Sequence, residues 1–348
     1  MDRDTQTELV FHNGDIRLGF HIGSYGTLFE SFQRVVETPI RSYQIYIAGE
    51  APWKPPVQTP TDILMTRQLL KRYPGRYACV HGSLMYNLAG CVGGRNDPKF
   101  SRALQNTING LTGELDVAAG FGAGVVVHIG AAKKKDQGMF TISRAIEAAL
   151  DKETPYTKTL SKEIQVPVKL NRKIILENAA GEGNKIGSNL DEIAFIINGI
   201  DERYHPQIKV CIDTAHIFGA GQYDFGKTDQ VVQFYEDFDA KIGLDKLELF
   251  HLNDSRAAYG TKKDRHENLG MGYIFGVDRD ERPIEDGGDG DGLEGLRKLI
   301  DFAEERRTPL VGEPPQYDRH KNPAVGPVWD YNVIRHICSL EKEVFVCE

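Results

Sequence analysis

The chain has 348 residues, of which 40% are hydrophobic and 26% charged, and its formal net charge at pH 7 is -8. This length suits one α/β barrel with insertions, so we expect a single domain over residues 1–348. The negative charge argues weakly against nucleic-acid binding, because such proteins usually carry a basic field, although local patches can overrule the net value.

The N-terminal stretch MDRDTQTELVF lacks the basic segment and apolar run of a secretory signal. The most apolar stretch, 120–132, is shorter than the roughly 20 residues of a membrane helix. The five cysteines are scattered and form no Cys-x-x-Cys pair, which argues against a disulfide framework. We therefore expect a monomer that is not secreted, does not bind membranes and works in a reducing compartment, cytoplasmic or nuclear.

Short runs rich in β-branched and aromatic residues recur along the chain between longer amphipathic stretches. The predicted strands are 17–22, 43–47, 77–81, 124–128, 173–177, 208–213, 247–251 and 309–313. Apolar runs such as VVVH, KIILE and LELFH are typical of strands covered on both faces. Helical spacing dominates 139–150, 190–200 and 293–302.

Eightfold alternation of strand and helix predicts a (β/α)8 TIM barrel, with a doubly wound open sheet as the alternative. Two segments fall outside this pattern. Residues 1–16 form a polar leader, and residues 278–292 form an acidic, glycine-rich insertion. We expect both to be solvated segments rather than functional sites.

Polar residues capable of binding metal end six of the eight predicted strands: His81, His128, Glu177, Asp213, His251 and Glu313. In TIM barrels the C-terminal ends of the strands carry the active site, so these side chains should converge. Three further candidates, His216, Asp264 and His266, follow two of those strands in the same loops. The sequence therefore predicts nine metal-binding side chains in one pocket.

Buried carboxylates and histidines need compensating charge, because each uncompensated buried ion costs several kcal/mol. Nitrogen and oxygen ligands without thiolate suit zinc, with manganese or iron as substitutes. Nine ligands exceed the three that one catalytic zinc typically takes, so two or three ions are indicated. Neighbouring ions suit phosphoester displacement, which favours hydrolysis of a phosphate ester over sugar isomerisation.

Six blocks, in order, resemble the signature blocks of the endonuclease IV family of apurinic/apyrimidinic (AP) endonucleases. They are HGSLMYNLAG, VVVHIG, ILENAAGEGNKIG, VCIDTAHIFGAGQYD, FHLNDSRAAYGTKKDRHENLG and VGEPP. The resemblance runs from about residue 18 to residue 315. It implies a TIM-barrel DNA-repair enzyme with three zinc ions. Such an enzyme hydrolyses the phosphodiester 5′ to an abasic site in duplex DNA and leaves a 3′-hydroxyl and a 5′-deoxyribose phosphate.

The resemblance also implies how the ligands are shared among the ions. One zinc would take His81, His128 and Glu177, and a second would take Glu177, Asp213, His251 and Glu313. Glu177 would bridge the two and is the predicted catalytic residue. The third zinc would take His216, Asp264 and His266.

The DNA-contacting residues are matched less completely than the ligands. Arg265 would reach a phosphate, with Arg256 and Lys262 nearby. Leu84 and Met85 stand where the family commonly has a tyrosine-leucine pair that enters the DNA, and an apolar wedge can still unstack a kinked base step. The arginine that the family also inserts should fall near residues 50–53, where this chain has none.

Other features carry less functional meaning. The stretch AGEGNKIG at 180–187 lacks phosphate-loop spacing and is interpreted as a strand-end turn. His21 is interpreted as a structural residue rather than a tenth ligand. Two other functions remain open: a sugar isomerase or epimerase, which needs fewer ligands, and a non-catalytic abasic-DNA binding protein, which would have lost some of them.

Overall fold

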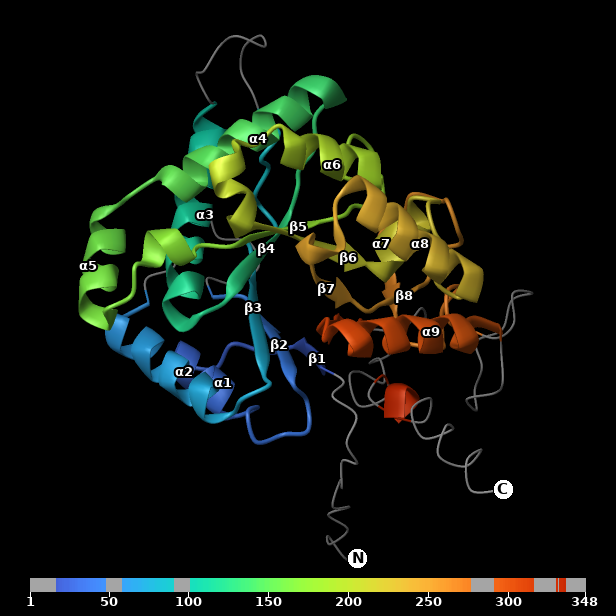
Figure 1. Ribbon diagram of the computed structural model, residues 1–348, viewed down its shortest axis with the longest axis horizontal. Coiled ribbons are helices and arrows are strands. Elements are labelled where there is room, and N and C mark those ends of the chain that lie inside the picture. The colour runs from blue at the N-terminus through green and yellow to red at the C-terminus, as the bar shows by residue number, and fades with distance from the viewer. Residues whose placement is uncertain are drawn as a thin grey trace, which may run out of the picture.

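Eight parallel strands close into a barrel in the computed structural model, which describes residues 17–47, 58–90, 101–276, 291–315, 330 and 332–335 (Figure 1). The strands are β1 (Leu18–His21), β2 (Ser42–Ile45), β3 (Tyr77–His81), β4 (Gly124–His128), β5 (Ile174–Glu177), β6 (Ile208–Asp213), β7 (Leu247–His251) and β10 (Leu310–Gly312). Each strand pairs with its neighbours in the chain, and β10 returns to pair with β1.

Helices surround the barrel and alternate with the strands (Figure 1). Those in the described part of the chain are α1 (Leu28–Gln33), α2 (Pro60–Arg72), α3 (Arg102–Phe121), α4 (Lys135–Asp151), α5 (Pro155–Ile164), α6 (Leu190–Asn198), α7 (Thr214–Gly219), α8 (Thr228–Lys241) and α9 (Asp291–Arg306). An antiparallel hairpin of β8 (Asp254–Ser255) and β9 (His266–Glu267) follows β7.

The predicted TIM barrel is confirmed, and the open-sheet alternative is wrong because β1 and β10 are hydrogen-bonded to each other. The predicted leader 1–16 lies outside the described residues, as does most of the insertion 278–292. The last two residues of that insertion begin α9 instead. In the described part of the chain, no helix is long and apolar enough to span a bilayer.

Side-chain alternation along the strands separates two apolar regions. Val126, Ile175 and Leu249 pack with the buried thiols Cys79 and Cys211 in one small cluster, whereas Val125 and Val127 belong to the large cluster shared with the helices. Successive strand side chains point to opposite faces, so the small cluster fills the barrel interior. This apolar layer lies below the strand ends that carry the polar side chains.

The strand register brings the polar ends together. His128 on β4 is paired with Glu177 on β5, and Asp213 on β6 is paired with His251 on β7. Each of these residues is the last of its strand. The C-terminal mouth of the barrel therefore collects side chains that are far apart in sequence.

Helix α3 supports the loop that follows β3. It begins at the N-cap Ser101, ends at Gly122, whose φ of 95° suits glycine, and carries Glu114, which is only 1% exposed. A Cβ atom on Gly82 would lie 3.3 Å from a carboxylate oxygen of Glu114, so this carboxyl is packed directly against the loop. Burial raises the pKa of Glu114 to about 8.

We expect Glu114 to make stability depend on pH. Its pKa in the folded protein lies above the ordinary value of 4.5, so the stability that it contributes is fully present below pH 4.5 and is lost as the pH rises through about 8. One pKa unit corresponds to about 1.4 kcal/mol, so the wild type should lose about 3 kcal/mol more than Glu114→Gln between roughly pH 6 and pH 9. Urea unfolding at both pH values measures this difference. Equal losses in the two proteins would contradict it.

Candidate metal centre

All nine side chains proposed as metal ligands lie at the C-terminal mouth of the barrel. His81, His128, Glu177, Asp213 and His251 end their strands, Glu313 follows β10 directly, His216 lies in α7, His266 begins β9, and Asp264 lies just before it. Three groups can be drawn from this set. Within each group, the ligand atoms all lie within 4.8 Å of one another. The groups are His81, His128 and Glu177; Glu177, Asp213, His251 and Glu313; and Asp213, His216 and His266.

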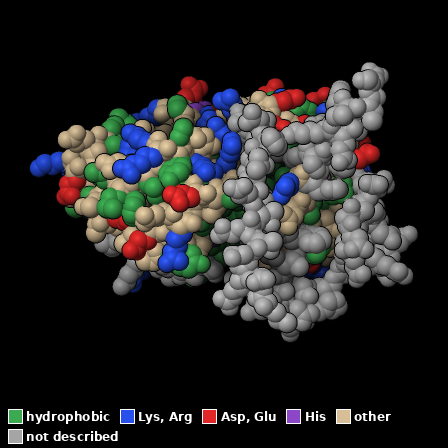
Figure 2. Space-filling model, turned by 90° about the horizontal axis from the view of Figure 1, so that it is seen from below, with side chains coloured by type: hydrophobic (Ala, Val, Ile, Leu, Met, Phe, Trp, Pro, Cys, Tyr) green, Lys and Arg blue, Asp and Glu red, His purple; other side chains and the backbone are tan. Residues whose placement is uncertain are grey.

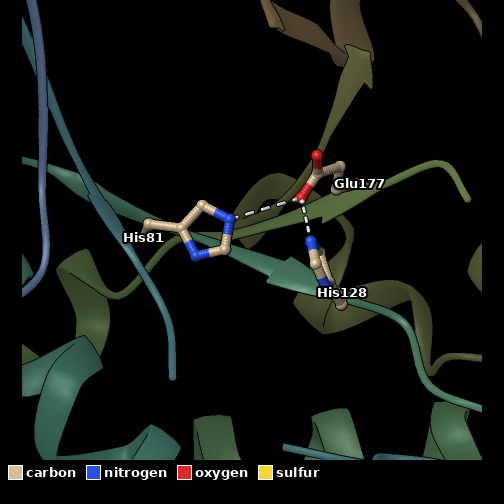
Figure 3. A group of neighbouring side chains, drawn as sticks. All are labelled: His81, His128 and Glu177. Atoms are coloured by element: carbon tan, nitrogen blue, oxygen red, sulfur yellow. Dashed lines mark ion pairs between the residues drawn. The ribbon is translucent and has the colours of Figure 1, made fainter. Parts of the chain in front are cut away.

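Glu177 is the centre of the arrangement and is 1% exposed. One carboxylate oxygen, Oε2, lies 3.6 Å from His81 Nε2 and 3.1 Å from His128 Nε2 (Figure 3). The other oxygen, Oε1, lies 2.9 Å from His251 Nδ1 and 3.6 Å from His216 Nδ1. Four imidazoles therefore face one carboxylate, and Glu177 belongs to two of the three groups.

The second group lies around His251, which is fully buried. Besides the contact with Glu177, its Nδ1 lies 3.4 Å from Glu313 Oε2 and 3.9 Å from Asp213 Oδ2. Three carboxylates thus surround one buried ring nitrogen. Such a density of negative charge requires protons or cations nearby.

The third group is larger than the sequence predicted. Asp264 Oδ1 lies 3.2 Å from His216 Nε2 and 3.5 Å from His266 Nε2, as the predicted trio requires. In addition, Asp213 Oδ2 lies 3.5 Å from His266 Nε2, so Asp213 stands between the second and third groups. The family resemblance implied Asp213 in the second group alone, and the contact with His266 also places it beside the third.

Three buried polar atoms of these residues have no hydrogen-bond partner among the described residues: Glu177 Oε2, His216 Nε2 and His266 Nε2. Buried polar atoms are normally satisfied, so unpaired atoms aimed into one space fit a missing ligand. Burial alone would lower the pKa of His216, but the carboxylates of Asp213 and Asp264 raise it well above its ordinary value. Divalent cations would replace the protons that the carboxylates otherwise hold on the histidines.

Gln44, which the sequence analysis did not select, links two of these ligands. Its Nε2 donates to Glu313 Oε1 at 2.7 Å, and its Oε1 accepts from His251 Nε2 at 2.8 Å. Its amide also lies 3.2 Å from His21 Nδ1, and burial lowers the pKa of His21 to about 4. Gln44 therefore orients His251 so that Nδ1 faces the carboxylates. The only signal in the sequence was a polar residue within an apolar strand.

Two asparagines complete the support around Asp213. Asn253 Nδ2 donates to Asp213 Oδ2 at 2.7 Å, and Asn253 Oδ1 accepts from the backbone N–H of Glu313 at 2.8 Å. Asn178 Oδ1 accepts from the backbone N–H of Asp213 at 2.6 Å. Asp213 Oδ1 accepts from the backbone N–H of His216 at 2.8 Å, so hydrogen bonds hold both carboxylate oxygens in place.

The residues predicted to contact DNA differ in their surroundings. Leu84 and Met85 are 46% and 39% exposed, whereas Tyr86, next in the chain, is buried. Arg265 and Lys262 are exposed. Arg256 forms an ion pair with Glu267 at 2.9 Å, which compensates its charge locally. Residues 50–53, where the family arginine was sought, lie outside the described residues.

Comparison with known proteins supports the assignment of the fold as a TIM barrel. Residues 32–290 match the family model of the xylose isomerase-like TIM barrel, so the chain belongs to this class of barrels. The solved structure of endonuclease IV from Thermus thermophilus is similar in fold, with a TM-score of 0.67, 22% sequence identity, and coverage of 94% of this chain and 99% of that one.

Similar proteins identify the family within this class of barrels. A "Probable endonuclease 4" of Citrifermentans bemidjiense is 30% identical over 74% of this chain and 83% of its own length, and one of Halothermothrix orenii is 29% identical over 87% and 94%. The chain therefore belongs to the endonuclease IV family, as its sequence blocks predicted, and it is an enzyme of the nuclease class.

We predict that Gln44→Ala weakens metal binding. Removing the amide leaves His251 and Glu313 without their shared partner, and loss of such an orienting bond typically costs about 10- to 100-fold in metal affinity. Competition with a chromophoric chelator measures the change. Gln233→Ala, on the outer helix α8, is the matched control. Unaltered affinity in Gln44→Ala would show that the ligands hold their positions unaided.

Proposed function

We propose that this protein hydrolyses the phosphodiester 5′ to abasic sites in duplex DNA, leaving a 3′-hydroxyl and a 5′-deoxyribose phosphate. One observation carries the proposal: three groups of candidate ligands meet in one mouth and share Glu177 and Asp213. Clustered metal sites suit phosphoester displacement, in which both the attacking and the leaving oxygen need stabilisation. Family membership supports the same reaction.

We infer that the three groups hold three zinc ions per chain, with manganese as a possible substitute. Imidazole nitrogens and carboxylate oxygens without thiolate are the donor set that zinc accepts at catalytic sites. Bound zinc supplies an activated water and positive charge for the oxygens of the phosphate. The protein residues supply the positions: Glu177 faces two groups, Asp213 stands between two, and Gln44, Asn178 and Asn253 orient them.

The two alternative functions require fewer metal ligands than this site contains. A sugar isomerase or epimerase of the same barrel class has no use for a third group. Here Asp264 Oδ1 lies 3.2 Å from His216 Nε2 and 3.5 Å from His266 Nε2. A non-catalytic abasic-DNA binding protein would have no reason to retain all nine ligands. The complete set favours catalysis.

Duplex DNA with an abasic site is the proposed partner. The net charge is -8, but Lys and Arg side chains lie among Asp, Glu and hydrophobic side chains on the described part of the face in Figure 2. Arg265 and Lys262 are exposed and lie close in sequence to Asp264 and His266, and we propose that they bind phosphates. Leu84 and Met85 would act as the apolar wedge at the lesion. We further propose a single-domain monomer that works in the cytoplasm or nucleus.

Metal analysis tests the stoichiometry. We expect about three zinc or manganese ions per chain in active protein, because the ligands exceed what two catalytic ions need when each keeps an open position. Dialysis against a chelator should remove both the ions and the activity, and added zinc should restore both. One ion or fewer in active protein would contradict the trinuclear centre.

A duplex with one abasic analogue tests the reaction, and Glu177→Gln tests the centre. We expect the wild type to make a single cut whose 3′ end a polymerase can extend. Glu177→Gln should reduce cleavage to background while abasic-duplex binding persists, because the substitution removes the shared negative charge and touches no base. Turnover near the wild-type rate would remove Glu177 from the mechanism. An intact duplex after prolonged incubation with the wild type would refute the proposed function.

The wedge is tested by truncating Leu84 and Met85 together to alanine. Loss of both side chains should raise the cost of kinking the duplex, a term of a few kcal/mol, and lower the preference for abasic over intact duplex by roughly 10-fold. Zinc content should not change. Leu170→Ala, which truncates an apolar side chain that is 76% exposed in the turn before β5, is the control. Unchanged preference combined with lost zinc would mean that the pair only packs the loop carrying His81.

A further inference from the structure

A cavity of about 330 Å³ opens beside the metal centre. Leu84 and Met85 line one part of it, and His128, Glu177 and His216 line another. Among the described residues that line this cavity, Lys185 is the one with a permanent positive charge. The cavity thus joins the proposed wedge to the metal ligands, with a lysine on its wall.

The loop that carries Lys185 is fixed by backbone contacts. Lys185 forms an antiparallel bridge with Ala131, and the N–H of Ile186 donates to the carbonyl oxygen of Gly130 at 2.9 Å. Gly181 and Gly183 have φ values of 82° and 55°, which allow the chain to turn back toward the loop after β4. The position of the lysine is therefore set by the fold rather than by its own contacts.

The ammonium group of Lys185 has two carboxylate partners. Its Nζ lies 3.2 Å from Glu182 Oε2 and 3.5 Å from Asp264 Oδ2. The backbone N–H of Asp264 also donates to Glu182 Oε1 at 2.9 Å, so the three residues form one network beside the third ligand group. An ammonium group has three N–H donors, so two carboxylates leave one donor available. The side chain is 33% exposed, so a ligand in the cavity can reach that donor.

We propose that Lys185 binds a non-bridging oxygen of a backbone phosphate of the abasic strand, and so places that strand against the third ligand group. This inference rests on the proposed function. The 180–187 segment, interpreted from the sequence as a strand-end turn, follows β5 and contains turns and one isolated bridge. The proposed contact therefore uses one side chain rather than a phosphate loop. The substrate group is recognised by its charge alone.

Binding measurements on the zinc-loaded protein test the contact. Lys185→Gln should weaken binding of an abasic-analogue duplex by roughly 10-fold, as expected for loss of a charge-assisted hydrogen bond. The slope of log affinity against log salt concentration should fall by about 0.9, the value for one phosphate contact. Lys158→Gln, which removes an exposed lysine on the outer helix α5, should leave both quantities unchanged.

A double-mutant cycle identifies the phosphate. Single neutral methylphosphonates replace each phosphate around the lesion, and their effects are compared in the wild type and in Lys185→Gln. We expect one position at which neutralisation weakens wild-type binding but has no further effect in the variant. The proposal would be overturned if no methylphosphonate position is coupled to Lys185→Gln, the salt slope is unchanged and the zinc content falls. Lys185 would then only support Asp264. Wild-type protein that does not prefer the abasic duplex would instead refute the proposed function.

Discussion

Mutual repulsion among four carboxylates, two of them buried and two partly buried, is the main constraint on the barrel mouth. Glu177, Asp213, Asp264 and Glu313 lie in one barrel mouth, and the imidazoles beside them are the only partners several of their oxygens have among the described residues. Such an assembly is stable only with compensating cations, since buried charges without partners cost several kcal/mol each. Metal binding should therefore also stabilise the folded barrel mouth. The amides of Gln44, Asn178 and Asn253 hold the carboxylates in positions that charge repulsion alone would disfavour.

The barrel and the meeting of these polar side chains were predictable because each strand shows a pattern of its own. KIILE and VVVH are mainly apolar and end in a side chain that can bind metal, so the buried strand and its polar end are visible in four or five residues. The predicted ends at His81, His128, Asp213 and His251 coincide with the observed strand ends. Parallel pairing then requires the ends to meet at one face, whatever the lengths of the loops between them.

Other features depend on contacts between distant segments, and local pattern does not encode them. The strands β8 and β9 have two residues each, too few for a periodic signal. The ion pair between Arg256 and Glu267 forms across that hairpin. Asp213 reaches a second ligand group only because His266 folds back toward β6. Gln44 is separated from His251 by 207 positions in the chain.

The two thiols inside the barrel bear on metal selectivity. Cys79 and Cys211 stand two residues before His81 and Asp213, on the same faces of β3 and β6, so a layer of sulfur lies directly beneath the nitrogen and oxygen ligands. Burial raises the pKa of both thiols, that of Cys211 to about 12, and keeps them as neutral S–H groups. A neutral thiol is a poor ligand, because metals bind the thiolate. A thiophilic ion such as copper(I) or cadmium would have to displace a proton from one of these buried sulfur atoms before the sulfur could act as a ligand. The apolar interior of the barrel thus adds a desolvation cost to sulfur ligation.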